Sequence, residues 1–145
     1  MHFISGGAFN GKKKAVKNRL LGEYEWYSAY KQDSFPTSND VQANCVVIEG
    51  LERYFYEWSK KQTSIDDIRY RFSELATEWR HWEAQENNRQ VYWIGTDITK
   101  GIVPLQALDR KTRDVTGYCY QDLVKLCTDV TVVWFGLLKT MKEGK

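Results

Sequence analysis

The sequence predicts a single α/β domain, residues 1–145, with a mostly parallel central sheet of about five strands. Short apolar runs alternate with longer segments of helical periodicity, which is typical of strands joined by crossover helices. A glycine-rich turn that ends in lysine follows the first apolar run directly. The length of 145 residues suits one core, and no repeat, linker or low-complexity segment divides the chain.

The strands are predicted from short runs rich in β-branched and aromatic residues. These runs cover residues 2–5, 24–28, 45–48, 91–94 and 131–135, and residues 137–142 are a candidate edge strand. The helices are predicted from apolar residues at a spacing of three or four. They cover residues 12–21, 51–61, 64–87 and 105–127, the last with a bend near Gly117. Residues 31–40 carry the Pro, Ser, Asn and Asp typical of a surface loop.

Charge and cysteine content exclude several classes of protein. The 21 basic and 19 acidic residues leave a net charge of +2, too small to indicate a nucleic-acid or membrane partner. No segment approaches the ~20 apolar residues needed to cross a bilayer, and the charges near the N-terminus follow the apolar run, opposite to a signal peptide. Cys45, Cys119 and Cys127 form no CxxC pair and are expected to be small buried hydrophobes. We therefore expect a cytoplasmic protein.

The segment between the first predicted strand and the first predicted helix carries the main chemical motif. It reads GxxxxGK, and its residues are Gly6, Gly7, Ala8, Phe9, Asn10, Gly11 and Lys12. Glycines let several backbone N–H groups point at one anion, the helix N-terminus adds its positive dipole end, and the lysine reaches the terminal phosphates. The motif predicts a nucleotide-binding loop. The alternative is an ordinary glycine-rich turn followed by lysines on a solvated helix face.

Lys13 stands where such a loop has a Ser or Thr whose hydroxyl binds Mg²⁺. An ammonium group cannot bind a cation, so three interpretations remain open. The metal ion is held elsewhere, or Lys13 and Lys14 neutralise part of the phosphate charge in its place, or catalysis has been lost. The chain has two histidines, His2 and His81, too few for a histidine metal site, so no metal-ligating residues are predicted.

Glu49 follows the apolar run of residues 45–48 directly. An acidic residue at the carboxyl end of a parallel strand can orient a metal ion or a water molecule beside bound phosphates. We therefore predict Lys12 and Glu49 as the catalytic pair. The alternative for Glu49 is an ordinary loop carboxylate.

A second motif lies in the C-terminal third of the chain. It consists of Lys100, Gly101, Ile102, Val103 and Pro104, followed by Leu108, Arg110, Arg113, Asp114, Gly117 and Gln121. This series is similar to the pattern GxGIVPxxxxxRxFRDxxGxxNQ of the cobinamide kinase / cobinamide-phosphate guanylyltransferase family. The opening HFISGGAFNGKKK resembles the first strand and phosphate loop of that family, and CVVIEG resembles its third strand. The stretch between Tyr24 and Gln42 is shorter than in the family.

The resemblance implies a P-loop NTPase-like three-layer fold and a kinase of cobalamin biosynthesis that phosphorylates the aminopropanol hydroxyl of cobinamide. It implies ATP or GTP as the donor, Mg²⁺ beside it, a cobinamide-type corrinoid as the acceptor, and trimers. Asp97, Arg110 and Arg113 are then candidates for contacting phosphate or substrate, and otherwise belong to surface ion pairs. The family's guanylyl transfer uses a histidine after the second strand, and the matching segment SAYKQDSFPTSNDVQ has none.

Three functions stay open at this point. The first is a cobinamide kinase-like phosphotransferase that keeps the phosphate loop. The second is a catalytically lapsed protein that binds a nucleotide or corrinoid and acts in regulation or assembly. The third is a nucleic-acid- or protein-binding module that uses Lys12, Lys13, Lys14 and Lys17 with exposed aromatic residues, against which the modest net charge argues.

Overall fold

The computed structural model describes residues 1–7, 11–61, 64–99 and 101–144 of the chain. The strands are β1 (His2–Gly6), β2 (Glu25–Ser28), β3 (Cys45–Glu49), β4 (Gln90–Thr96), β5 (Asp129–Trp134) and β6 (Leu137–Lys142). The helices are α1 (Lys12–Lys17), α2 (Leu51–Lys60), α3 (Ile65–Ala84) and α4 (Ala107–Leu126), with short 3-10 helices η1 (Ala29–Lys31) and η2 (Ser38–Asp40). Within these ranges no helix is long and apolar enough to cross a membrane.

The strands form one sheet in the order β2-β3-β4-β1-β5-β6. All neighbours are parallel except β5 and β6, which pair as an antiparallel hairpin at one edge. This confirms the mostly parallel α/β sheet, and the candidate edge segment is its sixth strand. After β1 the chain crosses to β2, at one edge of the sheet. After β4 it crosses in the opposite direction, past β1, to β5. Connections thus diverge from the carboxyl ends of β1 and β4, which is where open α/β sheets bind ligands.

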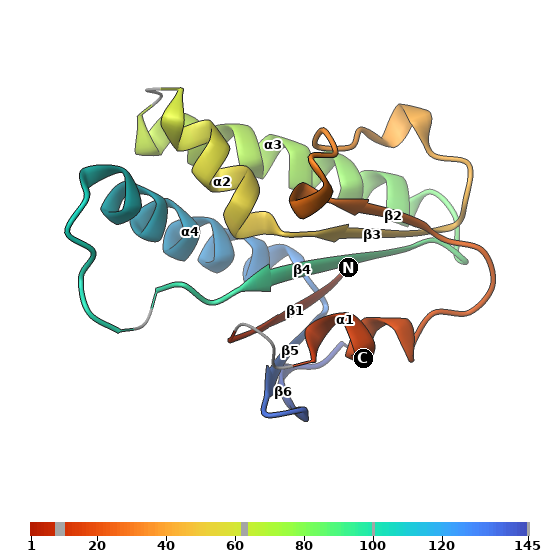
Figure 1. Ribbon diagram of the computed structural model, residues 1–145. Coiled ribbons are helices and arrows are strands. Elements are labelled where there is room, and N and C mark those ends of the chain that lie inside the picture. The colour runs from red at the N-terminus through yellow and green to blue at the C-terminus, as the bar shows by residue number, and fades with distance from the viewer. Residues whose placement is uncertain (8–10, 62–63, 100, 145) are drawn as a thin grey trace.

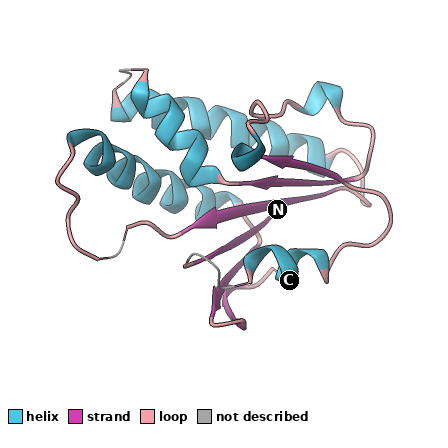
Figure 2. Ribbon diagram, viewed as in Figure 1, coloured by secondary structure: helices cyan, strands magenta, loops and turns pink. Residues whose placement is uncertain are grey.

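Helices cover the two faces of the sheet unequally. Figures 1 and 2 show α2, α3 and α4 together on one face and α1 alone on the other. The helices divide between the two faces in this way because right-handed crossovers that run in opposite directions along a sheet place their helices on opposite faces. The sheet is therefore the middle layer of three, and one outer layer consists of the six-residue helix α1.

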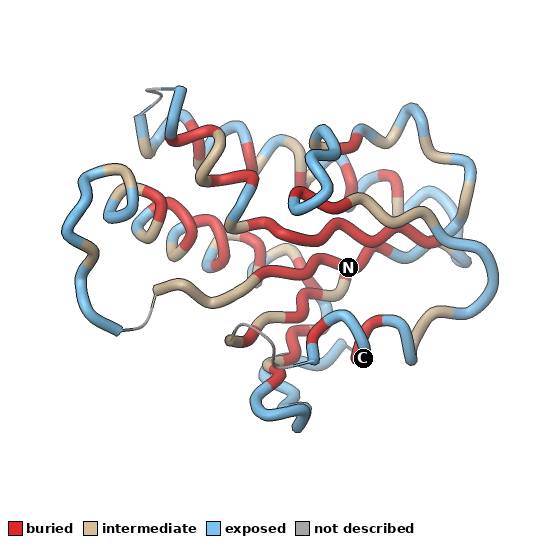
Figure 3. Tube along the Cα trace, viewed as in Figure 1, coloured by how far each residue is buried: buried red, intermediate tan, exposed pale blue. Residues whose placement is uncertain are grey.

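The larger core lies between the sheet and the three-helix layer, and it is built mainly of aromatic side chains. The ring of Phe72 on α3 meets Phe55 on α2 and Trp93 on β4 edge-on, with centroids 5.0 Å and 5.8 Å apart. Phe35, from the loop after β2, packs into the same cluster, and Trp79 Nε1 donates to the carbonyl oxygen of Pro36 at 3.2 Å. Figure 3 shows buried residues along β3, β4 and the inner sides of these helices.

The smaller core lies beneath α1. Ala15 and Val16 of α1 cover Ile4 on β1, Val47 on β3 and Ile94 on β4. In these three strands they are the residues that alternate away from the larger core, as the two-residue period of a strand requires. Their packing fixes α1 against the sheet immediately after the glycine-rich loop.

Some element boundaries differ from those predicted. Helix α1 ends at Lys17 rather than at 21, since the backbone turns at Asn18 and leaves the Leu21 side chain 91% exposed. Helix α3 ends at Ala84 rather than at 87, and the guanidinium of Arg89 donates to the carbonyl oxygen of Trp82 at this end. Helix α4 begins at Ala107 rather than at 105 and runs through Gly117 as one continuous helix.

Two local predictions are confirmed, the start of a helix at residue 64 and the burial of the three cysteines. The side chain of Ser64 caps α3 by accepting a hydrogen bond from the N–H of Asp67 at 3.1 Å. All three cysteines are buried and free, and burial raises the pKa of Cys119 and of Cys127 to about 12. These thiols therefore stay protonated at neutral pH, which suits small hydrophobes in a core.

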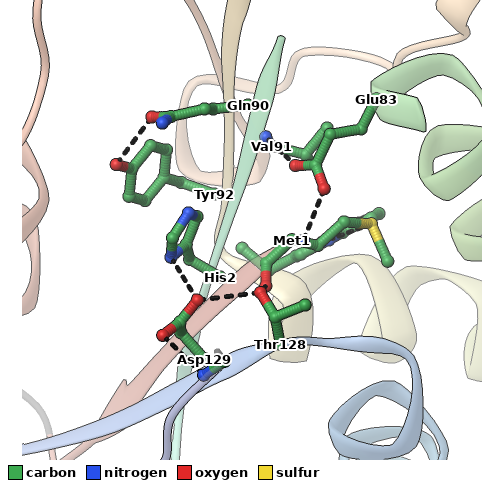
Figure 4. Close-up of polar contacts among 10 residues, drawn as sticks. Met1, His2, Glu83, Gln90, Val91, Tyr92, Thr128 and Asp129 are labelled. Atoms are coloured by element: carbon green, nitrogen blue, oxygen red, sulfur yellow. Dashed lines mark hydrogen bonds and ion pairs between the residues drawn. The ribbon is translucent and has the colours of Figure 1, made fainter. Parts of the chain in front are cut away.

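A polar cluster closes the amino end of the sheet (Figure 4). The His2 ring stacks on Tyr92 with centroids 4.6 Å apart, and its Nδ1 lies 3.3 Å from Oδ2 of Asp129. Glu83 from α3 binds the amino group of Met1 at 2.6 Å and accepts a hydrogen bond from the N–H of Val91 at 2.8 Å. His2 thus lies at the end of β1 opposite the glycine-rich loop.

Stability is expected to fall as the pH drops below 6.5, because burial, reinforced by the nearby amino group of Met1, lowers the pKa of His2 from 6.5. Below pH 6.5, His2 binds a proton more readily in the unfolded chain than in the folded protein. The free energy of unfolding therefore decreases between pH 6.5 and the lower pKa of His2 in the folded protein. Urea denaturation from about pH 8 to pH 5 should show this slope, reduced in His2→Gln and unchanged in His81→Gln, a substitution at an exposed position of α3. Equal slopes in His2→Gln and the parent protein would exclude His2 as the cause.

Candidate functional site

The glycine-rich loop lies between β1 and α1, at the carboxyl edge of the sheet. Gly6, Gly7, Gly11 and Lys12 belong to the part of the chain that the structure describes. The predicted loop residues Ala8, Phe9 and Asn10 lie outside the described residues. The anchors of the loop on both sides, and the side chains that surround Lys12, therefore define the site.

Gly6 ends β1 in tight contact with β5. A Cβ atom at this position would lie 2.1 Å from the carbonyl oxygen of Val133, the residue beside Gly6 in the parallel register. The carbonyl oxygen of Gly6 in turn accepts a hydrogen bond from the N–H of Asp97 at 2.8 Å. The start of the loop is thus held between β4 and β5, and position 6 requires glycine because there is no room for a side chain.

Lys12 is the buried lysine of the site. Its side chain belongs to the first turn of α1 and is 8% exposed, whereas Lys13 and Lys14 are exposed. The Nζ atom donates a 2.7 Å hydrogen bond to the carbonyl oxygen of Gly7, so the side chain turns back over the beginning of the loop. Burial lowers the pKa of Lys12. A cation held this way has given up most of its hydration and favours an anionic partner.

Two carboxylates partly offset the effect of burial on Lys12. The negative charges of Glu52 and Glu49 both raise the pKa of Lys12, Glu52 by the larger amount. Glu49 is the last residue of β3 and is buried, and in the alternation of that strand it shares the α1 side with Cys45 and Val47. The predicted pair Lys12 and Glu49 is therefore brought into one electrostatic neighbourhood.

Glu52 is a site residue that the sequence analysis missed. It lies in the first turn of α2, where its Oε1 accepts a 2.8 Å hydrogen bond from the N–H of Thr96 and its Oε2 accepts one from the hydroxyl of Tyr30. The signal was the spacing EGLE, which places two carboxylates three residues apart across a strand-to-helix junction.

Asp97 and Arg113 hold the segment that follows β4. Asp97 Oδ1 accepts hydrogen bonds from the N–H of Thr99 at 2.9 Å and from its hydroxyl at 2.6 Å. Arg113 Nε on α4 donates to the carbonyl oxygen of Thr99 at 3.0 Å. These contacts fix the chain just beyond the point where β4 meets β1. Both predicted residues thus lie at the carboxyl edge.

Arg110 is engaged elsewhere. Its Nη1 donates to the carbonyl oxygen of Pro104 at 3.1 Å and also to that of Leu105, both in the segment leading into α4. The guanidinium group therefore stabilises the start of its own helix. Of the three residues suggested for phosphate or substrate contact, Asp97 and Arg113 lie with the β4 end and Arg110 does not.

Lys13 points away from this centre. Its Nζ lies 5.3 Å from the centroid of the Trp26 ring, a cation–π contact on the α1 side of the sheet. The described residues contain no group of three or more His, Cys, Asp or Glu arranged to hold a metal ion. Glu49 and Asp97 are the carboxylates at this edge that the prediction had named, and oxygen ligands of this kind suit Mg²⁺ in combination with substrate phosphates.

A cleft opens beside the site on the three-helix side of the sheet. Its volume is about 1090 Å³, and its lining includes Tyr30, Glu52, Tyr54, Tyr56, Trp58 and Arg113. Glu52 is thus shared between the cleft and the surroundings of Lys12. Charged side chains, among them Asp33, Arg53, Glu57 and Arg71, line the cleft together with the aromatic ones.

Comparison with known protein families gives no matching family model, and comparison with curated proteins gives no match either.

Proposed function

We propose that this chain binds a nucleoside triphosphate at the loop between β1 and α1 and transfers its terminal phosphoryl group. The observation that carries the proposal is Lys12, a buried ammonium group beside Glu52 and Glu49 at the carboxyl edge of the sheet. A buried lysine without a hydrogen-bonded carboxylate partner is costly for stability, and a function that needs the charge accounts for it. The divergence of connections at β1 and β4 supports the same location.

In this proposal the terminal phosphates replace the carbonyl oxygen of Gly7 as partners of Lys12 Nζ. Lys12 then neutralises charge that builds up on the transferred group, which is the main demand of phosphoryl transfer. Glu49 and Asp97 are the residues that would hold Mg²⁺, together with phosphate oxygens. The ion would supply further neutralisation of the phosphate charge. Arg113 positions the segment after β4 through the carbonyl oxygen of Thr99.

The acceptor proposed from the resemblance is a cobinamide-type corrinoid. The neighbouring cleft of about 1090 Å³ is compatible with a large ligand, and its aromatic lining suits a flat ring system. Guanylyl transfer through a histidine is not part of the proposal. His2 lies at the amino end of β1, and His81 is exposed near the end of α3.

Titration of the full chain with ATP and with GTP tests the proposal. Lys12→Ala is expected to weaken binding roughly 10- to 100-fold, because a hydrogen bond to a charged group contributes about 1.5–3 kcal/mol. Lys14→Ala, which removes an exposed lysine of the same helix, is the matched control and should bind as the parent protein does. Product analysis with cobinamide then measures phosphoryl transfer. Equal binding by Lys12→Ala and the parent would exclude the loop as the site.

Nucleotide affinity is expected to fall at alkaline pH, because burial lowers the pKa of Lys12 from 10.5. The neutral amine cannot attract phosphate, so affinity decreases as the pH rises through the lowered pKa. Measured dissociation constants for ATP between about pH 7 and pH 10 should show this loss, and Lys12→Arg should show less of it because a guanidinium keeps its charge. Identical pH profiles for the two proteins would contradict the assignment to Lys12.

A second candidate function is favoured by Lys13. Its exposed side chain stands where a hydroxyl would bind the metal ion, and this favours a protein that binds nucleotide or corrinoid without turnover. Tight nucleotide binding with no phosphoryl transfer under any divalent metal would identify this function. Turnover of the bound nucleotide would exclude it.

A further inference from the structure

Tyr30 brings a hydroxyl group to the carboxylate that neighbours Lys12. The residue lies in η1, one turn beyond the end of β2, and its ring packs over Gly50, where a Cβ atom would come within 3.3 Å of Tyr30 Cζ. The hydroxyl donates a hydrogen bond to Glu52 Oε2. The side chain as a whole is 55% exposed and lines the cleft. Its hydroxyl is thus bound to a carboxylate that lines the same cleft.

Glu52 is held in place for this contact. Its other carboxylate oxygen accepts the N–H of Thr96, which belongs to the last residue of β4 and pairs in register with Gly6 at the start of the loop. The backbone of the central strand thus orients the carboxylate. A nucleophilic hydroxyl, a base that accepts its proton, and a third group that orients the base are the parts of an activated nucleophile.

The hydroxyl of Tyr30 stays protonated at neutral pH. Burial of the hydroxyl, together with the negative charge of Glu52, raises the pKa of Tyr30 strongly. The proton must therefore leave during any reaction at this oxygen, and Glu52 is already its acceptor. Transfer of an acceptor's proton to a positioned carboxylate is what phosphoryl transfer to a hydroxyl requires.

Two other hydroxyl groups near this edge, those of Thr99 and Ser28, differ from Tyr30. The hydroxyl of Thr99 donates to Asp97, which also accepts the adjacent backbone N–H of Thr99 itself. Ser28 is 1% exposed, and its Oγ is buried with no hydrogen-bond partner among the described residues. Tyr30 combines exposure with a hydrogen bond to Glu52, the carboxylate whose charge also raises the pKa of Lys12.

We propose that Tyr30 Oη accepts the terminal phosphoryl group of the bound nucleoside triphosphate, with Glu52 as the base, so that the protein phosphorylates itself at this residue. The inference rests on the proposed nucleotide site. In the step, a bond forms between Tyr30 Oη and the terminal phosphorus, and the bond from that phosphorus to the bridging oxygen breaks. The nucleoside diphosphate leaves with the bridging electrons, and the phenolic proton passes to Glu52. The product is a tyrosine phosphate monoester that faces the cleft.

Incubation of the full chain with ATP or GTP and Mg²⁺, followed by intact mass measurement and peptide mapping, tests the inference. We expect the mass of one phosphoryl group, located at Tyr30. Tyr30→Phe keeps the ring over Gly50 and should lose the modification completely. Glu52→Gln should slow it roughly 100-fold or more, the contribution of a general base. Tyr70→Phe is the matched control, because Tyr70 is an exposed tyrosine beside Glu74 on α3, and it should be modified as the parent is.

Nucleotide binding and circular dichroism are measured on the same samples, which separates the two proposals. Binding by the folded parent protein without phosphoryl transfer to Tyr30 would overturn the inference and leave the nucleotide site standing. Modification that persists in Tyr30→Phe, or an adduct with the mass of a nucleotidyl group, would also overturn it. Absence of nucleotide binding would overturn both proposals together. An unimpaired rate in folded Glu52→Gln would remove Glu52 as the base.

Discussion

Replacement of Gly6 by alanine is expected to destabilise the protein by about 3 kcal/mol or more and to abolish nucleotide binding at the loop. The new Cβ atom would lie 2.1 Å from the carbonyl oxygen of Val133, a backbone atom that cannot rotate away. Strands β1 and β5 must separate at this end, which also strains the hydrogen bond from the N–H of Asp97 to Gly6. Urea denaturation measures the first effect, and ATP titration of the remaining folded protein measures the second.

Gly22→Ala is the matched control for this substitution. Gly22 has a φ of 77°, and a Cβ atom there would meet nothing within 4 Å. The substitution therefore introduces the backbone strain of an alanine at positive φ, about 1 kcal/mol, without a steric clash. If Gly6→Ala lost no more stability than Gly22→Ala, the steric clash between β1 and β5 would be relieved without a cost in unfolding free energy, which would contradict this prediction.

Replacement of Phe72 by alanine is expected to cost about 3–5 kcal/mol of unfolding free energy. The Phe72 ring is fully buried where α3 meets α2 and β4, and it contacts Phe55 and Trp93 edge-on. Rigid aromatic neighbours from three elements cannot collapse into the space of a missing ring, so a cavity remains. Because these residues join the helix layer to the sheet, the whole domain should unfold at lower denaturant concentration.

Two further substitutions show whether the lost volume is the cause. Phe72→Leu keeps most of the volume and should cost less than half as much as alanine. Phe135→Ala removes the same atoms from a ring that is 78% exposed, and it should change stability by about 0.5 kcal/mol or less. Similar losses at positions 72 and 135 would contradict the placement of Phe72 at the centre of the larger core.

Much of the fold could be predicted from patterns that depend on local chemistry. Residues 45–48 form a buried strand because four consecutive apolar side chains suit a sheet covered on both faces. The start of α3 was predictable because Ser64 can cap only a backbone that turns into a helix there. The end of α1 was not, because Leu20 and Leu21 extend the apolar spacing beyond Lys17. Leu20 packs against the smaller core from outside the helix, whereas Leu21 is exposed, so the spacing did not mark the helix end.

The candidate site was predictable only in part. Lys12 and Glu49 carry signals in their immediate neighbours, a glycine-rich turn and an apolar strand. Tyr30 and Glu52 acquire their arrangement from β2, β4 and α2 meeting at one edge, which depends on strand order rather than on local spacing. For Arg110 the motif was misleading. The residue fits the family pattern, but its guanidinium group binds a backbone carbonyl only a few residues away instead of facing the site.

The unequal cover of the sheet has a consequence for how the molecule opens. Three helices seal one face, whereas on the other face α1 contributes only Ala15 and Val16 to the smaller core. Little apolar area holds α1, so it can detach and return while the rest of the domain stays folded. Amide hydrogen exchange should therefore be fastest among the helices in α1, and a bound anion that pulls Lys12 onto itself should slow it there first.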